Sequence, residues 1–342
     1  MQNSVDCSGD VHKRARTLIA DLELTVCSIE TQAKHPELFH YTKPAAFENI
    51  VKSNAFWASH YRDMANQGEV LLMRNRLPLA VAPRFDEIVS LVKLNRHGRR
   101  LWKKSGGGFG TARDFVESLY GATFDKRSDL TAMDAFMISF STHAAEGDVE
   151  REHGIWSQWR DYAGLDGFCI VLETAALGRM LGEEMDSRYW AHLMLDLVRY
   201  GDRPIEELFP ELVQASADTL RQFLDGEEPE MAVQQFLVGS TLLKDAGYRS
   251  EREVRIVGIP GTKRMSDQAA HDHPGVFKIL PLPEIRKRPG TMKRYVTIFE
   301  GAQAKLPIKR VIAGPMAGPQ GMDFAQSVVD GLPVTLSRCA PA

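Results

Sequence analysis

The chain has 342 residues, of which 44% are hydrophobic and 25% charged, and its formal net charge is −3. These are ordinary globular values with ample material for a core, and they give no global sign of a nucleic-acid binder or a membrane-surface protein. No apolar run approaches the roughly 20 residues that span a bilayer. The four cysteines lack the spacing of a disulfide framework or a metal site, and the polar N-terminus has no apolar signal segment. We therefore expect a cytoplasmic protein without a membrane partner.

The first predicted elements surround one histidine. Apolar residues at helical spacing after Asp10 predict a helix over residues 11–33. We expect it to pack on the core as an N-terminal element covering residues 1–35. The apolar run 38–41 predicts a strand that carries His40. A helix over residues 44–51 follows, with proline at its first turn, and a second strand covers residues 55–59.

Two helical stretches interrupt the strands that follow. A basic helical insertion is predicted at about 70–130 and an acidic one at about 175–240. A short aromatic helix covers 154–163, and the last helix covers 322–330. Further strands are predicted at 137–141, 167–172, 195–200, 251–257, 294–299, 309–313 and 333–336. Because the strands come singly between helices of varied length, we expect residues 36–340 to form a single α+β domain with a mixed sheet.

Two carboxylates stand close together on the strand predicted at 251–257. On a strand, Glu251, Glu253 and Arg255 share one face. This face is either solvated on an edge strand or lies at the rim of a cleft, where a fixed negative charge stabilises a developing cation. In the second case Arg255 would hold Glu253 ionised and in one rotamer.

His40 and the basic run at 96–104 also allow two interpretations each. A histidine beside aromatic residues on an apolar strand either packs in the core or holds a ligand. No second histidine or cysteine stands at metal-ligand spacing, so the sequence predicts no metal. The basic run is either a solvated helix face or a surface for phosphates, with Trp102 stacking on a base.

Several of these segments together resemble the uncharacterised bacterial family DUF2971. The resemblance extends from about residue 38 to 337 and departs after the second strand, where the family usually has Asn-Asp-Pro and an acid and this chain has Asn66-Gln67-Gly68-Glu69. It rests on Phe39-His40-Tyr41-Thr42, Phe56-Trp57-Ala58-Ser59, Ile138-Ser139-Phe140-Ser141, Gly167-Phe168-Cys169-Ile170 and Glu251-x-Glu253-x-Arg255.

The order of these parts is in turn similar to that of ADP-ribosyltransferases. Phe39-His40-Tyr41-Thr42 resembles their histidine strand, Ser139-Phe140-Ser141-Thr142 resembles a Ser-Thr-Ser strand, and Glu251-x-Glu253 resembles their glutamate pair. This second resemblance implies a split sheet of the ADP-ribosyltransferase type. It also implies an enzyme that uses NAD as substrate and needs no metal.

The same resemblance implies roles for individual residues. Glu253 would stabilise the cation that forms when the nicotinamide–ribose bond breaks, and Glu251 would orient or deprotonate the acceptor. His40 would hold the ribose, and Trp57 or Tyr61 would stack on nicotinamide. The remaining residues expected around NAD are Tyr41, Thr42, Ser59, Asn66, Ser139, Ser141 and Arg255.

The acceptor would be a protein or a nucleic acid, and the enzyme would act as a toxin or an antiphage defence effector. The alternative from the sequence is a non-catalytic module that binds a nucleotide or a peptide in the same cleft.

Overall fold

The computed structural model of the protein describes residues 29–64, 68–92, 94, 96–124, 134–143, 149–226, 232–272 and 278–340. The chain divides into two compact units. The sheet unit comprises Met1–Ser59, Ile138–Leu197 and Glu251–Ala342, and the helical unit comprises His60–Met137 and Val198–Ser250. The acidic insertion expected at 175–240 is thus shared between them, because residues 175–197 belong to the sheet unit.

The sheet unit is built on an open, mixed sheet, which confirms the α+β class. Ten of the described strands form it, in the order β12-β11-β4-β1-β3-β2-β10-β9, with β8 pairing with both β3 and β5. The central neighbours β1 and β4 are antiparallel, as are β4 and β11, whereas β11 and β12 are parallel. The strands are β1 (Glu37–Thr42), β2 (Phe56–His60), β3 (Phe136–Ser141), β4 (Phe168–Glu173), β5 (Trp190–Leu197), β8 (Glu253–Pro260), β9 (Arg286–Lys287), β10 (Arg294–Ile298), β11 (Ile308–Ala313) and β12 (Val334–Leu336).

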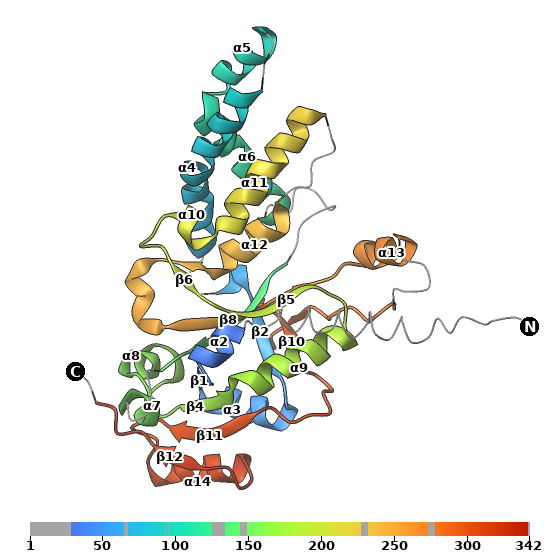
Figure 1. The fold of residues 1–342 in the computed structure, drawn as a ribbon. Coiled ribbons are helices and arrows are strands. Elements are labelled where there is room, and N and C mark those ends of the chain that lie inside the picture. Colours follow the sequence, from blue (N-terminus) through green and yellow to red (C-terminus); the bar gives the residue numbers. More distant parts are fainter. Residues whose placement is uncertain are drawn as a thin grey trace, which may run out of the picture. The chain divides into compact units, whose positions relative to one another are not determined.

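Short helices precede or connect these strands (Figure 1). They are α2 (Ile29–Lys34), α3 (Pro44–Ser53), α7 (Val149–His153), α8 (Trp156–Gln158), the π-helix η2 (Trp159–Ala163), α9 (Thr174–Ser187), α13 (Lys263–Asp272) and α14 (Gly318–Val328). Phe47 of α3 stacks on Phe168 of β4 at 4.5 Å between ring centroids, and Phe324 of α14 lies 5.8 Å from Phe168. These rings cover one face of the sheet.

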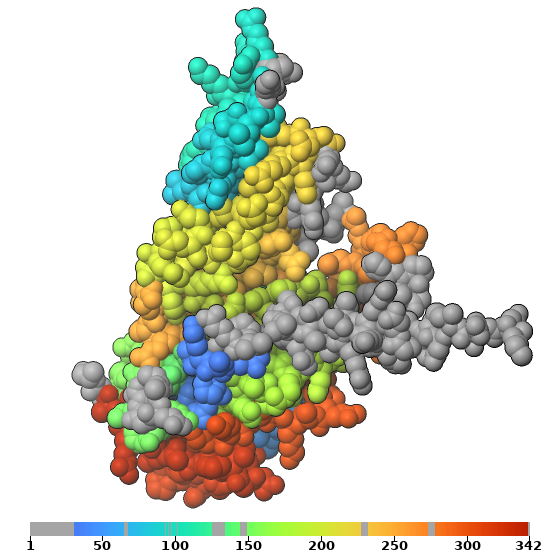
Figure 2. All heavy atoms as spheres, viewed as in Figure 1, coloured from blue at the N-terminus to red at the C-terminus, as the bar shows by residue number. Residues whose placement is uncertain are grey.

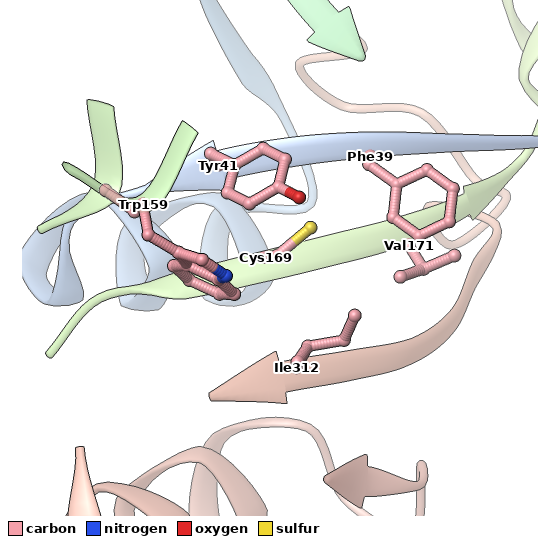
Figure 3. Packing of buried hydrophobic residues seen from close by; sticks show 7 residues of the cluster. Phe39, Tyr41, Trp159, Cys169, Val171 and Ile312 are labelled. Atoms are coloured by element: carbon pink, nitrogen blue, oxygen red, sulfur yellow. The ribbon is translucent and has the colours of Figure 1, made fainter. Parts of the chain in front are cut away.

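The other face of β1 carries a separate aromatic cluster (Figure 3). Tyr41 lies edge-on to Trp159 with ring centroids 4.9 Å apart, Phe39 lies near Val171, and Cys169 and Ile312 belong to the same buried set. The Tyr41 hydroxyl accepts a hydrogen bond from the Ile155 backbone N–H at 2.9 Å. Gly154, whose φ is +81°, leaves room for this approach, because a Cβ there would lie 2.8 Å from the Tyr41 hydroxyl. The cluster therefore ties the segment before η2 to the centre of the sheet.

The helical unit is organised around one long helix, α4 (Gly68–Leu91), which packs against α6 (Gly107–Phe124), α11 (Pro210–Asp225) and α12 (Val233–Leu242). Phe124 and Phe236 join α6 to α12 with ring centroids 6.1 Å apart. The unit also holds η1 (Tyr61–Asp63), α5 (Arg96–Lys104), β6 (Arg199–Tyr200), α10 (Ile205–Leu208), β7 (Leu243–Lys244) and the 3-10 helix η3 (Ala246–Glu251), whose last residue belongs to the sheet unit. The turquoise atoms of α5 project at the surface of this unit (Figure 2).

Most predicted strands match the observed ones within a few residues, but two predictions are wrong. The single strand expected at 195–200 is two elements, β5 and β6, in different sheets. The strand expected at 251–257 begins only at Glu253, because the residues before it form η3. Of the helix expected at 11–33, residues 11–28 lie outside the described residues, and α2 covers only its end.

Candidate functional site

Three strands that carry the candidate motifs are neighbours in the sheet. β1 carries His40, β3 carries Ser139 and Ser141, and β8 carries Glu253. β3 pairs with both of the others, with β1 through Ser141 and Phe39, and also with β8. The end of β3 meets the start of β8, where the Thr142 N–H donates to the Arg252 carbonyl at 2.9 Å. Motifs that are far apart in the sequence are thereby assembled in one part of the sheet.

The His40 imidazole is held in a defined orientation on β1. Its Nδ1 lies 3.0 Å from the Ser139 carbonyl oxygen, so Nδ1 carries the proton and donates it. The ring also packs edge-on against Phe56 and tilted against Phe140, with centroids 5.3 and 5.4 Å away. Burial lowers the pKa of His40, and the hydrogen bond to Ser139 offsets only part of that effect. A neutral ring fixed in this tautomer has a lone pair on Nε2, which can accept a hydrogen bond from a ligand hydroxyl.

Glu253 forms a bidentate ion pair with Arg255 on the same strand. Arg255 Nε donates to Glu253 Oε1 at 2.7 Å, and the second contact, to Oε2, is 3.0 Å. Both residues are almost fully buried, with 4% of Glu253 and 1% of Arg255 exposed. A buried fork of this kind fixes the carboxylate in one rotamer. The expected partnership of Glu253 and Arg255 is present in the structure.

Glu251 does not share a strand face with Glu253, contrary to the prediction. It ends η3, and the residue between the two glutamates, Arg252, has a left-handed φ of +45°. This turn reorients the backbone, and the Glu251 carboxylate accepts a hydrogen bond from the Tyr162 hydroxyl at 2.9 Å. Glu251 is partly exposed, unlike Glu253. The two carboxylates therefore lie in different environments, one accessible and one buried.

Tyr41 and Thr42 differ from His40 in their surroundings. Because side chains alternate along a strand, Tyr41 points to the face opposite His40, into the cluster of Figure 3. Its hydroxyl lies 3.2 Å from Nε2 of His143, and burial raises the pKa of Tyr41. Thr42 is on the His40 face but is buried opposite Phe168 of β4. The structure thus assigns Tyr41 to the core and leaves His40 as the partly exposed polar side chain of β1.

The structure does not bring Trp57 and Ser59 to His40. Phe56, which contacts His40, alternates with them along β2, so Trp57 and Ser59 occupy the opposite face. There Trp57 stacks on Tyr295 of β10 at 4.4 Å, and Ser59 accepts a hydrogen bond from Arg288 at 2.7 Å. Trp57 and Ser59 therefore make their contacts on the face of β2 that points away from His40.

The remaining candidates are distributed over both units. The side chains of Ser139 and Ser141 lie on the Phe39 side of β3, so it is the Ser139 backbone that meets His40. Tyr61 belongs to the helical unit, where it packs on Phe124 with ring centroids 4.9 Å apart. Asn66 lies outside the described residues.

Three ion pairs of this region were not predicted. Arg252 pairs with Glu150 at 2.7 Å, and Glu37 at the start of β1 accepts hydrogen bonds from Arg151 and Lys309 at 2.9 and 2.7 Å. Burial alone would raise the pKa of Glu37, but these hydrogen bonds and charges bring it down to about 2. The one signal in the sequence is an acid directly before an apolar strand, which does not identify its partners.

The structure also bears on metal binding and on membrane crossing. Among the residues that the structure describes, no three histidine, cysteine or acidic side chains gather as a metal site would require. In the same residues, no helix has the length and apolar character that a membrane crossing needs.

The protein is an α+β protein with an open mixed sheet. In this sheet β3 pairs with both β1 and β8, and these three strands carry candidate residues. Residues 158–256 match the model of a family described as "Protein of unknown function (DUF2971)". The matched segment includes Tyr162, Glu251 and the Glu253–Arg255 pair, and it supports the resemblance seen in the sequence. Neither the curated proteins nor the solved structures include a match to this chain.

Proposed function

We propose that the protein is an NAD-dependent, ADP-ribosyltransferase-like enzyme that modifies a protein or a nucleic acid. The observation that carries the proposal is the adjacency of β1, β3 and β8, which carry the histidine, the serines and the buried glutamate. The order of these motifs in the sequence resembles that of ADP-ribosyltransferases, and the pairing of β3 with both β1 and β8 supports the proposal.

The chemistry of this reaction suits the side chains on these strands. Breaking the nicotinamide–ribose bond builds positive charge on the ribose, and a fixed carboxylate nearby lowers the energy of that state. Glu253 is such a carboxylate, held in one rotamer by Arg255. His40 would accept a hydrogen bond from a ribose hydroxyl through Nε2. Glu251, which is the more accessible carboxylate, would deprotonate or orient the acceptor.

The direct test is incubation of the full chain with NAD labelled on the adenylate phosphate, in the presence of cell extract and nucleic acid. Nicotinamide release and transfer of label to a macromolecule are measured together. We expect Glu253→Gln to reduce turnover by roughly 100-fold or more, the usual effect of removing one transition-state electrostatic contact. Glu284→Gln is the matched control, because Glu284 is 69% exposed and pairs with Arg286 on the same unit.

The proposal fails if the wild-type chain neither consumes NAD nor labels a target. It fails equally if Glu253→Gln, with an unchanged melting temperature, turns over NAD at the wild-type rate. His40→Gln provides a second variant, and we expect it to raise KM for NAD more than it lowers kcat, because His40 is assigned to binding.

A second candidate is a non-catalytic module that binds a nucleotide or a peptide at the same strands. The closed, nearly inaccessible ion pair between Glu253 and Arg255 favours it, because a carboxylate used only for architecture has the same environment. The two candidates differ in one result. Glu253→Gln should abolish turnover in the enzyme but leave ligand affinity intact in the module.

A further inference from the structure

A stripe of positive charge runs along α5 of the helical unit. Its members, Arg96, Arg99, Arg100, Lys103 and Lys104, follow the spacing i, i+3, i+4, i+7 and i+8, so they lie along one side of the helix. All five are exposed. Within the part of the chain that the structure describes, none of them has a carboxylate within ion-pairing distance, although the protein as a whole carries a net charge of −3. These charges are therefore available to an external anion.

The position of α5 is fixed by contacts at its C-terminal end. The Ser105 hydroxyl donates to the Trp102 carbonyl at 2.7 Å, and the chain turns through Gly106, whose φ is +93°. The Gly108 N–H then donates to Asp86 Oδ1 of α4 at 2.9 Å. A Cβ at Gly108 would lie 2.5 Å from the Asp86 carboxylate, so this close approach depends on glycine. The stripe therefore lies on a helix whose C-terminal end is anchored to α4.

A pocket of about 620 Å³ adjoins the stripe within the same unit. Arg99 and Trp102 of α5 line one side, and Asp86, Val89 and Ser90 of α4 contribute to the other. The side chain of Trp102 is half-buried, which leaves part of the indole at the pocket. The Asp86 carboxylate is already engaged by the Gly108 N–H. An aromatic ring and a guanidinium therefore line a pocket beside a row of cations.

We infer that α5 and this pocket form a binding site for single-stranded nucleic acid, with phosphates along the cationic stripe and one base in the pocket against Trp102. Aromatic stacking together with a basic track is how proteins bind single strands without reading a sequence. A single strand is favoured over a duplex because its bases are free to leave the backbone line and enter a recess. A membrane surface fits less well, since an interfacial helix needs a broad apolar face, and the apolar residues in α5 are Leu101 and Trp102.

The test uses the full chain and four probes in a titration series over salt concentration. The probes are a fluorescein-labelled oligothymidylate, an abasic oligonucleotide of the same length, vesicles containing phosphatidylserine, and polyglutamate. We expect the oligothymidylate to bind tightest. Its log affinity should fall linearly with log salt, with a slope of roughly −3.5 if all five cations contact phosphates of a single strand. Tighter binding to vesicles or to polyglutamate than to the oligonucleotide would overturn the inference.

Two variants with the same change in net charge separate the stripe from the overall charge of the protein. Arg99→Glu with Arg100→Glu should weaken oligothymidylate binding by at least roughly tenfold and lower the salt slope by about 1.4, the contribution of two phosphate contacts. Arg264→Glu with Lys278→Glu is the matched control, because both residues are exposed cations of the sheet unit. It should change affinity less than about twofold. Equal losses in both double variants would contradict a site on α5.

The base pocket has its own test in Trp102→Ala. We expect this variant to lose roughly tenfold in affinity for oligothymidylate, as for the removal of one stacked base, and to bind the abasic strand like the wild type. An equal loss for both strands would show that no base stacks there. None of these measurements involves NAD, so the nucleic-acid site and the proposed enzyme are tested separately.

Discussion

The two units use charged side chains in opposite ways. In the sheet unit, buried charges are neutralised by neighbours: Glu253 by Arg255, and Glu37 by Arg151 and Lys309. In the helical unit, Glu69 and Lys244 form one nearly buried pair at 3.6 Å, but the cations of α5 are displayed at the surface. Charge in the first region fixes the positions of strands, whereas charge on α5 remains available for a partner. Substitutions of the same chemical kind should therefore have very different effects on stability in the two units.

The largest loss of stability is expected from Glu253→Ala. It removes the bidentate partner of a guanidinium that is only 1% exposed, and breaking such a buried pair costs about 3–5 kcal/mol. Urea unfolding followed by tryptophan fluorescence measures the change. Glu284→Ala, which removes an exposed pair, should cost less than about 1 kcal/mol. Equal losses of unfolding free energy in the two variants would show that the buried pair stabilises the fold no more than the exposed pair.

The next effect is a dependence of stability on pH. The pKa of Glu37 is about 2 in the folded protein, below its ordinary value of 4.5, because hydrogen bonds and charges of Arg151 and Lys309 outweigh the effect of burial. A lowered pKa stabilises the fold fully above about 4.5, and this contribution is lost as the pH falls towards 2. We expect about 1–3 kcal/mol from this group.

Urea unfolding of the wild type and of Glu37→Gln at a series of pH values isolates this contribution. The two curves should lie apart near neutral pH and converge in acid, because the variant has no carboxylate to titrate. Parallel curves at every pH would contradict the assigned role of Glu37.

A smaller effect is expected at Arg252, where the backbone turns between the two glutamates. Its left-handed φ of +45° costs an ordinary side chain roughly 1–2 kcal/mol, and glycine avoids that cost. Arg252→Gly should therefore stabilise the protein by about 0.5–1 kcal/mol despite losing the exposed Glu150 pair, whereas Arg252→Val should destabilise it. Thermal unfolding of the two variants measures the difference, and equal melting temperatures would exclude strain at this position.

The smallest effect is expected on α5. Arg99→Glu with Arg100→Glu should change the free energy of unfolding by less than about 0.5 kcal/mol, and in the stabilising direction, because like charges along one helix face repel. Circular dichroism during urea unfolding provides the measurement. A large destabilisation would mean that these arginines support the fold of the helical unit and are not held for a partner.

The strands of the sheet could be predicted because their signals are local. Apolar runs bounded by turn residues predicted β1 at 38–41, β3 at 137–141 and β4 at 167–172, and each lies within a residue or two of the observed strand. The role of His40 in holding a ligand stays a prediction. The structure is compatible with that role, because the side chain is partly exposed and, within the described residues, only Nδ1 is bonded, to the Ser139 carbonyl.

The error at Glu251 shows what a local pattern lacks. Residues 251–257 alternate as a strand should, yet the strand starts later, because the Arg252 carbonyl is held by Thr142 and the backbone there is left-handed. The contact between Thr142 and Arg252 joins residues far apart in the sequence, so the alternation of apolar and polar residues gives no sign of it. The stacking of Trp57 on Tyr295 was missed for the same reason. The division into two units likewise follows from non-local contacts, and composition alone did not locate its boundaries.

The strand order also has a consequence for biosynthesis. β4 receives its outer neighbour β11 only from residues 308–313, and β12 follows at 334–336, so these two strands are translated after every other described strand of the sheet. Every residue of the helical unit precedes Glu251. During synthesis from the N-terminus, the helical unit has its complete sequence while the central strands of the sheet still lack a partner. Until β11 has been synthesised, the outer edge of β4 is unpaired, and an unpaired strand edge is a place where chains can associate.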